Sequence, residues 1–170
     1  KSSWGGTDGK SLERIEAAVT PFDSANWGNS PDSTGATPGK QNYLTPLEND
    51  LKAVRIYSNL TLPGEPANIY TVIKNTGKNP TSNFSIKLFH DINNDTIPQE
   101  SELITFTTYT DSLARKDSVV VNLIWTNPGH GSKQLIALVE YQADMRIIDN
   151  TIIGLINISF PVQSLIINEI

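Results

Sequence analysis

The residues whose types and spacing best suit chemistry lie in the segment 91–95, Asp-Ile-Asn-Asn-Asp, with a further carboxylate at Glu100. Oxygen-bearing side chains at alternate positions, followed by a carboxylate, are typical of calcium-binding loops. The complete EF-hand pattern is absent, since no glycine stands at the sixth position and we place Gln99, Glu100 and Glu102 at offsets other than that of the twelfth-position glutamate. The alternative is a solvated loop in which Asp and Asn serve turn geometry. The candidate calcium ligands are Asp91, Asn93, Asp95 and Glu100.

No other grouping predicts catalysis. The two histidines, His90 and His130, are far apart in the sequence, and no serine or threonine is spaced to act as a nucleophile beside either. His130 lies in the segment 127–131, Asn-Pro-Gly-His-Gly, which predicts a hairpin loop. The carboxylates are scattered, and a sequence cannot show the pairing across a cleft that a glycosidase needs. The glycine-rich segment 5–9 precedes no helical pattern, so it lacks the helix dipole of a phosphate-binding loop. We therefore expect no enzymatic activity.

Charge and composition exclude several other classes. The 170 residues carry 18 acidic and 13 basic side chains, a formal net charge of -5, with no basic run. This balance argues against a nucleic-acid binder, which needs a positive surface. The absence of cysteine excludes disulfides, a thiol nucleophile and cysteine-ligated metals. No apolar run reaches the ~20 residues of a membrane span, and no signal peptide opens the chain, which we interpret as a processed chain or fragment.

The segments on either side of the candidate calcium ligands have the sequence pattern of β-strands. In the segment 68–74, Ile69, Thr71 and Ile73 share one face, which predicts an inner strand of a sandwich. The run stops at residues 75–77, Asn-Thr-Gly, which suit a turn because Asn and Gly tolerate positive φ. Seven such runs predict an all-β fold, an Ig-like or fibronectin-like β-sandwich. The predicted strands are Leu51–Tyr57, Asn68–Lys74, Phe84–Phe89, Leu103–Phe106, Ser118–Trp125, Gln134–Tyr141 and Ile152–Phe160.

Two parts of the sequence resemble known families. The motifs V-I-K-N-T-G at 72–77 and F-S-I-K-L-F at 84–89 resemble the Ig-like, cell-adhesion-related (CARDB-type) modules of bacteria. Trp4, G-K-S-L-E-R-I at 9–15, N-W at 26–27 and T-P-G-K-Q-N at 37–42 resemble the closing half of a bacterial lamin-tail domain. That family is an Ig-like sandwich with an opening strand of the form I-N-E-I.

The end of the chain matches that opening strand. The resemblance thus implies a partial lamin-tail-like segment and linker at 1–46, an Ig-like sandwich at 47–162, and a strand of a following or neighbouring β-domain at 163–170. Either neighbouring parts are missing, or this strand is donated to the sheet of another chain, since an exposed apolar strand requires a partner. The candidate strand-donating residues are Leu165, Ile166, Ile167, Asn168, Glu169 and Ile170.

We interpret the chain as a non-catalytic, extracellular structural or adhesion module of a bacterial surface protein, which could assemble into filaments by strand donation. N-x-S/T triplets at Asn59, Asn83, Asn94 and Asn157, and D-S/T-apolar triplets at residues 23, 95, 111 and 117, resemble glycan acceptors of exported proteins. One alternative is an accessory domain of a secreted nuclease or phosphatase, which the lamin-tail resemblance implies. The other is a carbohydrate-binding module, which predicts a row of exposed aromatics among Tyr57, Tyr70, Tyr109 and Tyr141.

Overall fold

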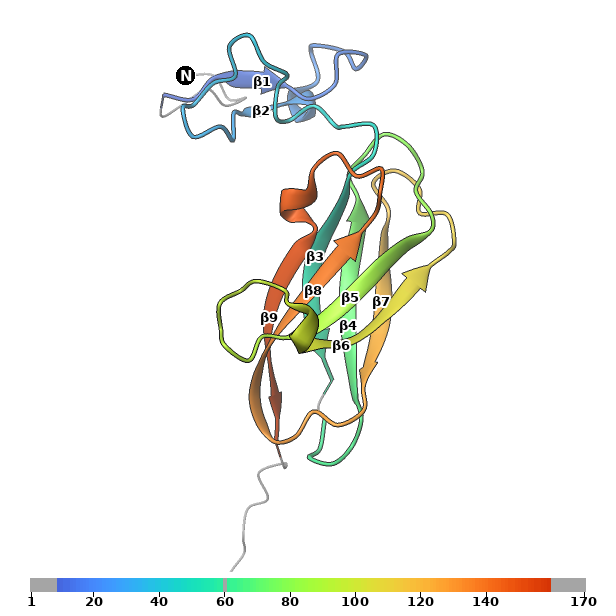
Figure 1. Ribbon diagram of the computed structural model, residues 1–170. Helices are drawn as coiled ribbons and strands as arrows, with labels where there is room; N and C mark the ends of the chain where they lie inside the picture. The colour runs from blue at the N-terminus through green and yellow to red at the C-terminus, as the bar shows by residue number, and fades with distance from the viewer. Residues whose placement is uncertain (1–8, 60, 160–170) are drawn as a thin grey trace, which may run out of the picture. The chain divides into compact units, whose positions relative to one another are not determined.

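The chain forms two compact units in the computed structural model, which describes residues 9–59 and 61–159 (Figure 1). The units divide between Glu48 and Asn49, whereas the sequence placed the boundary between residues 46 and 47. Trp4, the end of the seventh predicted strand at Phe160 and the candidate donated strand lie outside the described residues. Among the described residues, no helix has the length and apolar character needed to cross a membrane.

The first unit is held together by a small antiparallel sheet of β1 (Leu12–Arg14) and β2 (Trp27–Asn29), with the 3₁₀ turn η1 (Ser24–Asn26) before β2. Strand β1 thus lies within the motif at 9–15. Propensity did not predict β2, because a strand of three residues containing glycine has almost no alternation to read.

The motifs quoted for the lamin-tail resemblance form the hydrogen bonds of this unit. Glu13 is 7% exposed and accepts a hydrogen bond from Thr37 Oγ1 at 2.8 Å. Asn42 Nδ2 donates to the carbonyl of Arg14 at 2.7 Å, and Asn26 Nδ2 donates to the carbonyl of Glu16 at 2.8 Å. Glu13 is thus part of a packed polar network.

The second unit is a sandwich of two antiparallel sheets over residues 49–59 and 61–159, and its seven strands match the seven predicted ones (Figure 1). One sheet has the order β3-β4-β7, and the other has the order β6-β5-β8-β9. The strands are β3 (Leu51–Ser58), β4 (Ala67–Asn75), β5 (Phe84–His90), β6 (Leu103–Tyr109), β7 (Ser118–Trp125), β8 (Gly131–Glu140) and β9 (Thr151–Ile158), with 3₁₀ turns η2 (Glu100–Glu102) and η3 (Ile147–Asp149).

The core lies where the predicted faces meet. Strand β4 is the centre of its sheet, and Ile69, Thr71 and Ile73 are fully buried, so the prediction of an inner strand is confirmed. Phe84 and its neighbours on the same face of β5 are at most 1% exposed and pack against them. Period-2 alternation identifies this face correctly, because successive strand side chains point to opposite sides of the sheet.

The turn after β4 is built differently from the prediction. Neither Asn75 nor Gly77 is among the described residues with positive φ. The Asn75 side chain is instead fully buried, donating to the carbonyls of Asn79 at 2.8 Å and Leu113 at 2.9 Å and accepting from the N–H of Gly77 at 3.0 Å. The expectation of a left-handed Asn-Thr-Gly turn was wrong, because Asn75 serves as a hydrogen-bonding hub that joins β4 to the segment before β7.

The loop 127–130 was also misread, as a hairpin. Strand β7 pairs with β4, whereas β8 pairs with β5 and β9, so this loop crosses between the two sheets. Strand β8 begins at Gly131, three residues before the predicted Gln134. Alternation shows which face of a strand is buried but does not show which strand it pairs with.

The chain enters and leaves the sandwich at opposite ends. Strands β3 and β9 run in the same direction, and Thr61, which follows β3, forms a parallel bridge with Ile158 at the end of β9. Gly154 allows β9 to lie this close, because a Cβ atom there would stand 2.3 Å from Ile56 Cγ2. The eight residues of β3 span about 26 Å, so Leu51 and Ile158 lie at opposite ends of the long axis (Figure 1).

Candidate functional site

The candidate calcium loop connects β5 to β6, and Asp91 anchors it. The Asp91 side chain is 2% exposed; Oδ1 accepts from the N–H of Asp95 at 3.1 Å, and Oδ2 accepts from the N–H of Thr96 at 3.0 Å and from Gln134 Nε2 at 2.7 Å. Burial opposes ionisation of Asp91, but these hydrogen bonds outweigh it and hold its pKa below the usual value. Asp91 is therefore a fixed anion at the start of the loop.

The other three predicted ligands lie on the surface of the same loop. Asn93 Nδ2 donates to Asp95 Oδ2 at 2.9 Å, and Gln99 Nε2 donates to the same oxygen at 2.7 Å. Glu100 points to Lys87 on β5, with 3.7 Å between Oε1 and Nζ. The loop thus brings Asp91, Asn93 and Asp95 together, and directs Glu100 to the neighbouring strand.

Glu102 is the residue that the sequence analysis rejected as a ligand. It is 7% exposed, its Oε1 accepts from the N–H of Ile92 at 3.0 Å, and its Oε2 is buried with no hydrogen-bond partner. Counting Asp91 as the first position, Glu102 is the twelfth, which is the position of the glutamate in an EF-hand loop. The prediction that Glu102 falls at another offset was therefore wrong, and the correct count identifies Glu102 instead of Glu100.

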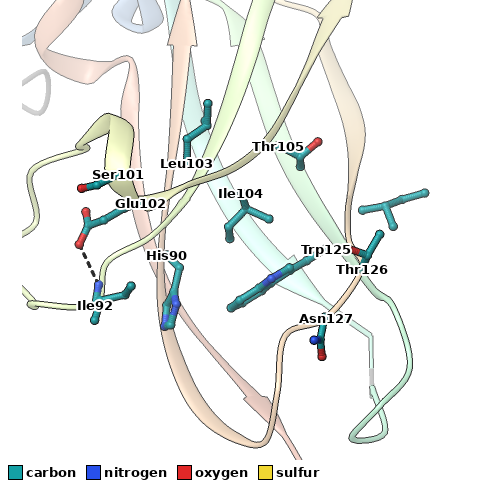
Figure 2. A pocket seen from close by; sticks show the side chains of 11 residues that line it. His90, Ile92, Ser101, Glu102, Leu103, Ile104, Thr105, Trp125, Thr126 and Asn127 are labelled. Atoms are coloured by element: carbon teal, nitrogen blue, oxygen red, sulfur yellow. Dashed lines mark hydrogen bonds between the residues drawn. The ribbon is translucent and has the colours of Figure 1, made fainter.

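Glu102 also lines a cavity of about 430 Å³ between the edge strands β6 and β7 (Figure 2). The rings of His90 and Trp125 lie 5.0 Å apart within it. Burial lowers the pKa of His90, and Lys133 lowers it further, while Glu102 and Asp91 act in the opposite direction. His90 is thus a neutral ring packed against Trp125, and its contact there is aromatic.

A second acidic group lies at the end of the sandwich where β3 begins. Burial raises the pKa of Asp50, which is 1% exposed, and the nearby charge of Asp149 raises it further; Arg146, with 3.5 Å between Nη1 and Asp50 Oδ2, offsets part of this. Burial likewise raises the pKa of Asp149, although Lys52 lies 3.8 Å from its Oδ2. The two carboxylates therefore share a partly desolvated site with two cations.

The four tyrosines do not form a row. Tyr57 and Tyr70 stack on each other with ring centroids 5.2 Å apart, and the guanidinium of Arg55 lies 4.7 Å above the Tyr57 ring. Tyr109 packs against Phe84, and Tyr141 packs against the core. This is cross-strand and core packing, so the planar platform that a carbohydrate-binding module requires is absent from these positions.

The predicted glycan acceptors lie on the surface. Asn59, Asn83, Asn94 and Asn157 are all exposed, as are the hydroxyl residues of the four D-S/T-apolar triplets. The acceptor residues are accessible in the folded chain, and modification at them stays a prediction.

Two solved structures have the same fold as the sandwich. The CARDB domain of a Pyrococcus furiosus protein, determined in complex with di-metal ions, aligns at a TM-score of 0.51 with 17% identity, over 69% of this chain and 100% of that one. A domain from a Methanosarcina acetivorans protein whose name places it at the cell surface aligns at 0.54 with 22% identity, over 66% of this chain and 93% of that one. The sandwich has the CARDB-type Ig-like fold. No family model matches the sequence, and no curated protein does.

The comparison bears out the CARDB-type resemblance at the level of the fold. It covers the sandwich and leaves the lamin-tail resemblance of the first unit as a prediction. The hydrogen bonds that join Glu13, Arg14 and Asn26 to distant residues give those motif positions a structural reason, without assigning the unit to that family.

Proposed function

We propose that the chain is a non-catalytic, extracellular structural module of a bacterial surface protein, in which the sandwich acts as a spacer. The observation that carries the proposal is the position of Leu51 and Ile158 at opposite ends of the sandwich. A domain that the chain enters at one end and leaves at the other extends a tandem array by its full length. The fold likeness to a domain from a protein named for the cell surface supports the same reading.

The flanking segments would join such modules. The first unit has the motifs of the closing half of a lamin-tail domain, and residues 165–170 have the pattern of its opening strand. A strand supplied by a second copy would pair its main-chain N–H and C=O groups with the acceptor sheet, and this pairing gives β-strand addition its affinity. Repetition of this contact would generate a filament, because a head-to-tail contact that does not close propagates.

The test is the size of the native particle, measured by light scattering on the full chain purified without denaturant. We expect large particles from the wild type, and chain-mass monomers after deletion of residues 165–170. Ile167→Pro should act like the deletion because proline removes a ladder donor, whereas Ile167→Val keeps the strand and serves as the matched control. A monomeric wild type that the deletion leaves unchanged would exclude the filament and leave a plain spacer.

A further inference from the structure

The loop 91–102 has twelve residues, and its polar side chains stand at the ligand positions of an EF-hand loop. In such loops, side chains at positions 1, 3, 5 and 12 and the backbone carbonyl at position 7 supply the oxygens. We propose that this loop binds one Ca²⁺ ion, with Glu102 in place of Glu100 as the terminal carboxylate. The proposed ligands are Asp91, Asn93, Asp95, the carbonyl of Ile97, and Glu102.

The proposal rests mainly on Glu102 Oε2, a buried oxygen that has no hydrogen-bond partner. Glu102 Oε1 is held by the N–H of Ile92, which lies inside the loop, and Figure 2 shows the carboxylate turned toward that residue. Its Oε2 has no hydrogen-bond partner and is shielded from solvent. A buried carboxylate oxygen without a partner is costly, and a cation in the loop would compensate it.

The backbone of the loop already makes the required turn. EF-hand loops use glycine at position 6 because the chain turns sharply there. Thr96 occupies that position with φ +64°, in the left-handed region that a β-branched residue rarely adopts. The Asp91 carboxylate holds this conformation by accepting the N–H groups of Asp95 and Thr96, so the loop reaches the turn without glycine.

Binding requires two exposed side chains to move. Among the described residues, no three acidic or histidine side chains stand close enough to hold a metal ion by themselves. Asp95 Oδ2 accepts from Asn93 Nδ2 and from Gln99 Nε2, and both bonds lie at the loop surface. Rotation of Asp95 and Asn93 toward Asp91 exchanges these bonds for metal ligation. It also gives up the bond from the N–H of Ile97 to Asp95 Oδ1 and the bond from the N–H of Asp95 to Asn93 Oδ1, all of them at exposed positions where water can replace them.

The donor set favours calcium over magnesium and a modest affinity. Three carboxylates, one amide and one carbonyl are hard oxygen ligands, and flexible side chains suit the variable geometry of Ca²⁺ better than the strict octahedron of Mg²⁺. Because the ligands must reorganise, we expect a dissociation constant on the order of 10⁻⁴–10⁻³ M, which is the range of extracellular calcium modules. The inference is independent of the proposed spacer and strand-donating roles, and either can fail alone.

The test is isothermal titration of the chelator-treated full chain with CaCl₂ to about 10 mM, ten times the weakest expected dissociation constant, with the melting temperature recorded in parallel. Wild type and Glu100→Gln should bind one Ca²⁺ equally well and melt higher with it, since Glu100 pairs with Lys87. Glu102→Gln retains an acceptor for the N–H of Ile92 yet loses the charge, and should bind about tenfold more weakly, a difference of about 1.4 kcal/mol. Asp95→Asn, at an exposed position, should weaken binding similarly without affecting the fold.

Three results would overturn the proposal. The wild type could give no saturable heat and no rise in melting temperature. Glu100→Gln could weaken binding as much as Glu102→Gln does, which would remove Glu102 from its assigned role. Mg²⁺ could bind as tightly as Ca²⁺, which the donor set does not allow.

Discussion

Replacement of Asn75 by alanine tests whether a buried side chain, and not backbone geometry, closes the turn after β4. The side chain makes three hydrogen bonds, to the carbonyls of Asn79 and Leu113 and from the N–H of Gly77. Two of these groups keep a second partner, since the carbonyl of Leu113 also accepts from the N–H of Thr81 and the N–H of Gly77 also donates to the carbonyl of Asp50. The loss is therefore smaller than three unsatisfied groups would give.

The expected destabilisation is about 2–3 kcal/mol. Each net hydrogen bond contributes about 1 kcal/mol, and the small void left at a fully buried position adds to the cost. With a denaturant dependence of about 2 kcal/mol per molar urea, the unfolding midpoint should fall by about 1–1.5 M. The matched control is Asn122→Ala, which removes the same side chain from an exposed strand position where its Nδ2 donates to Asn68 Oδ1 at 2.9 Å.

The measurement is urea unfolding followed by tryptophan fluorescence. The chain has three tryptophans, and replacing Trp4 and Trp27 with phenylalanine leaves Trp125 as the reporter of the sandwich. Asn122→Ala should move the midpoint by less than about 0.3 M, as expected of an exposed position. If Asn75→Ala moved it no further than this control, the assignment of Asn75 as the hub of the turn would be refuted.

Two further predictions concern packing and pH. Gly154→Ala should destabilise the sandwich by about 1–3 kcal/mol, because the added Cβ would collide with Ile56 Cγ2. In a double-mutant cycle, Ile56→Ala should recover part of this loss, and simple additivity of the two changes would contradict the prediction. The pKa values of Asp50 and Asp149 are raised in the folded state, so that state binds protons more tightly and stability rises as pH falls from 7 toward about 4. Asp149→Asn should therefore stabilise the fold at pH 7 by about 0.5 kcal/mol, despite the loss of the ion pair with Lys52. This gain in stability over the wild type should shrink near pH 4.5. A variant less stable than the wild type at pH 7 would contradict the prediction.

The alternation of apolar residues predicted the strands and their buried faces. All seven runs over the sandwich became strands, and the buried face of β4 was read correctly from Ile69 to Ile73. The signal is local, because side chains two positions apart share a face of a strand whatever the rest of the chain does. The same reasoning misread the loop after β7, since the partner of a strand depends on residues far away in the sequence.

The candidate calcium loop also shows how far the sequence alone could predict the site. The sequence identified the loop and three of its oxygen-bearing side chains, because these side chains stand at every second position of the sequence. The choice between Glu100 and Glu102 could have been made by counting positions, but only the fold shows that Glu100 reaches Lys87 while Glu102 turns back to Ile92.

By itself, the sequence determined an all-β sandwich, its inner faces and the position of a polar loop, because alternation and loop chemistry are properties of neighbouring residues. The tertiary structure alone decided which strands pair, how Asn75 closes its turn and that Glu102 Oε2 is left buried without a partner. It also decided that the chain leaves the sandwich opposite to where it enters. These features depend on contacts between distant segments, which form only when the whole core is assembled.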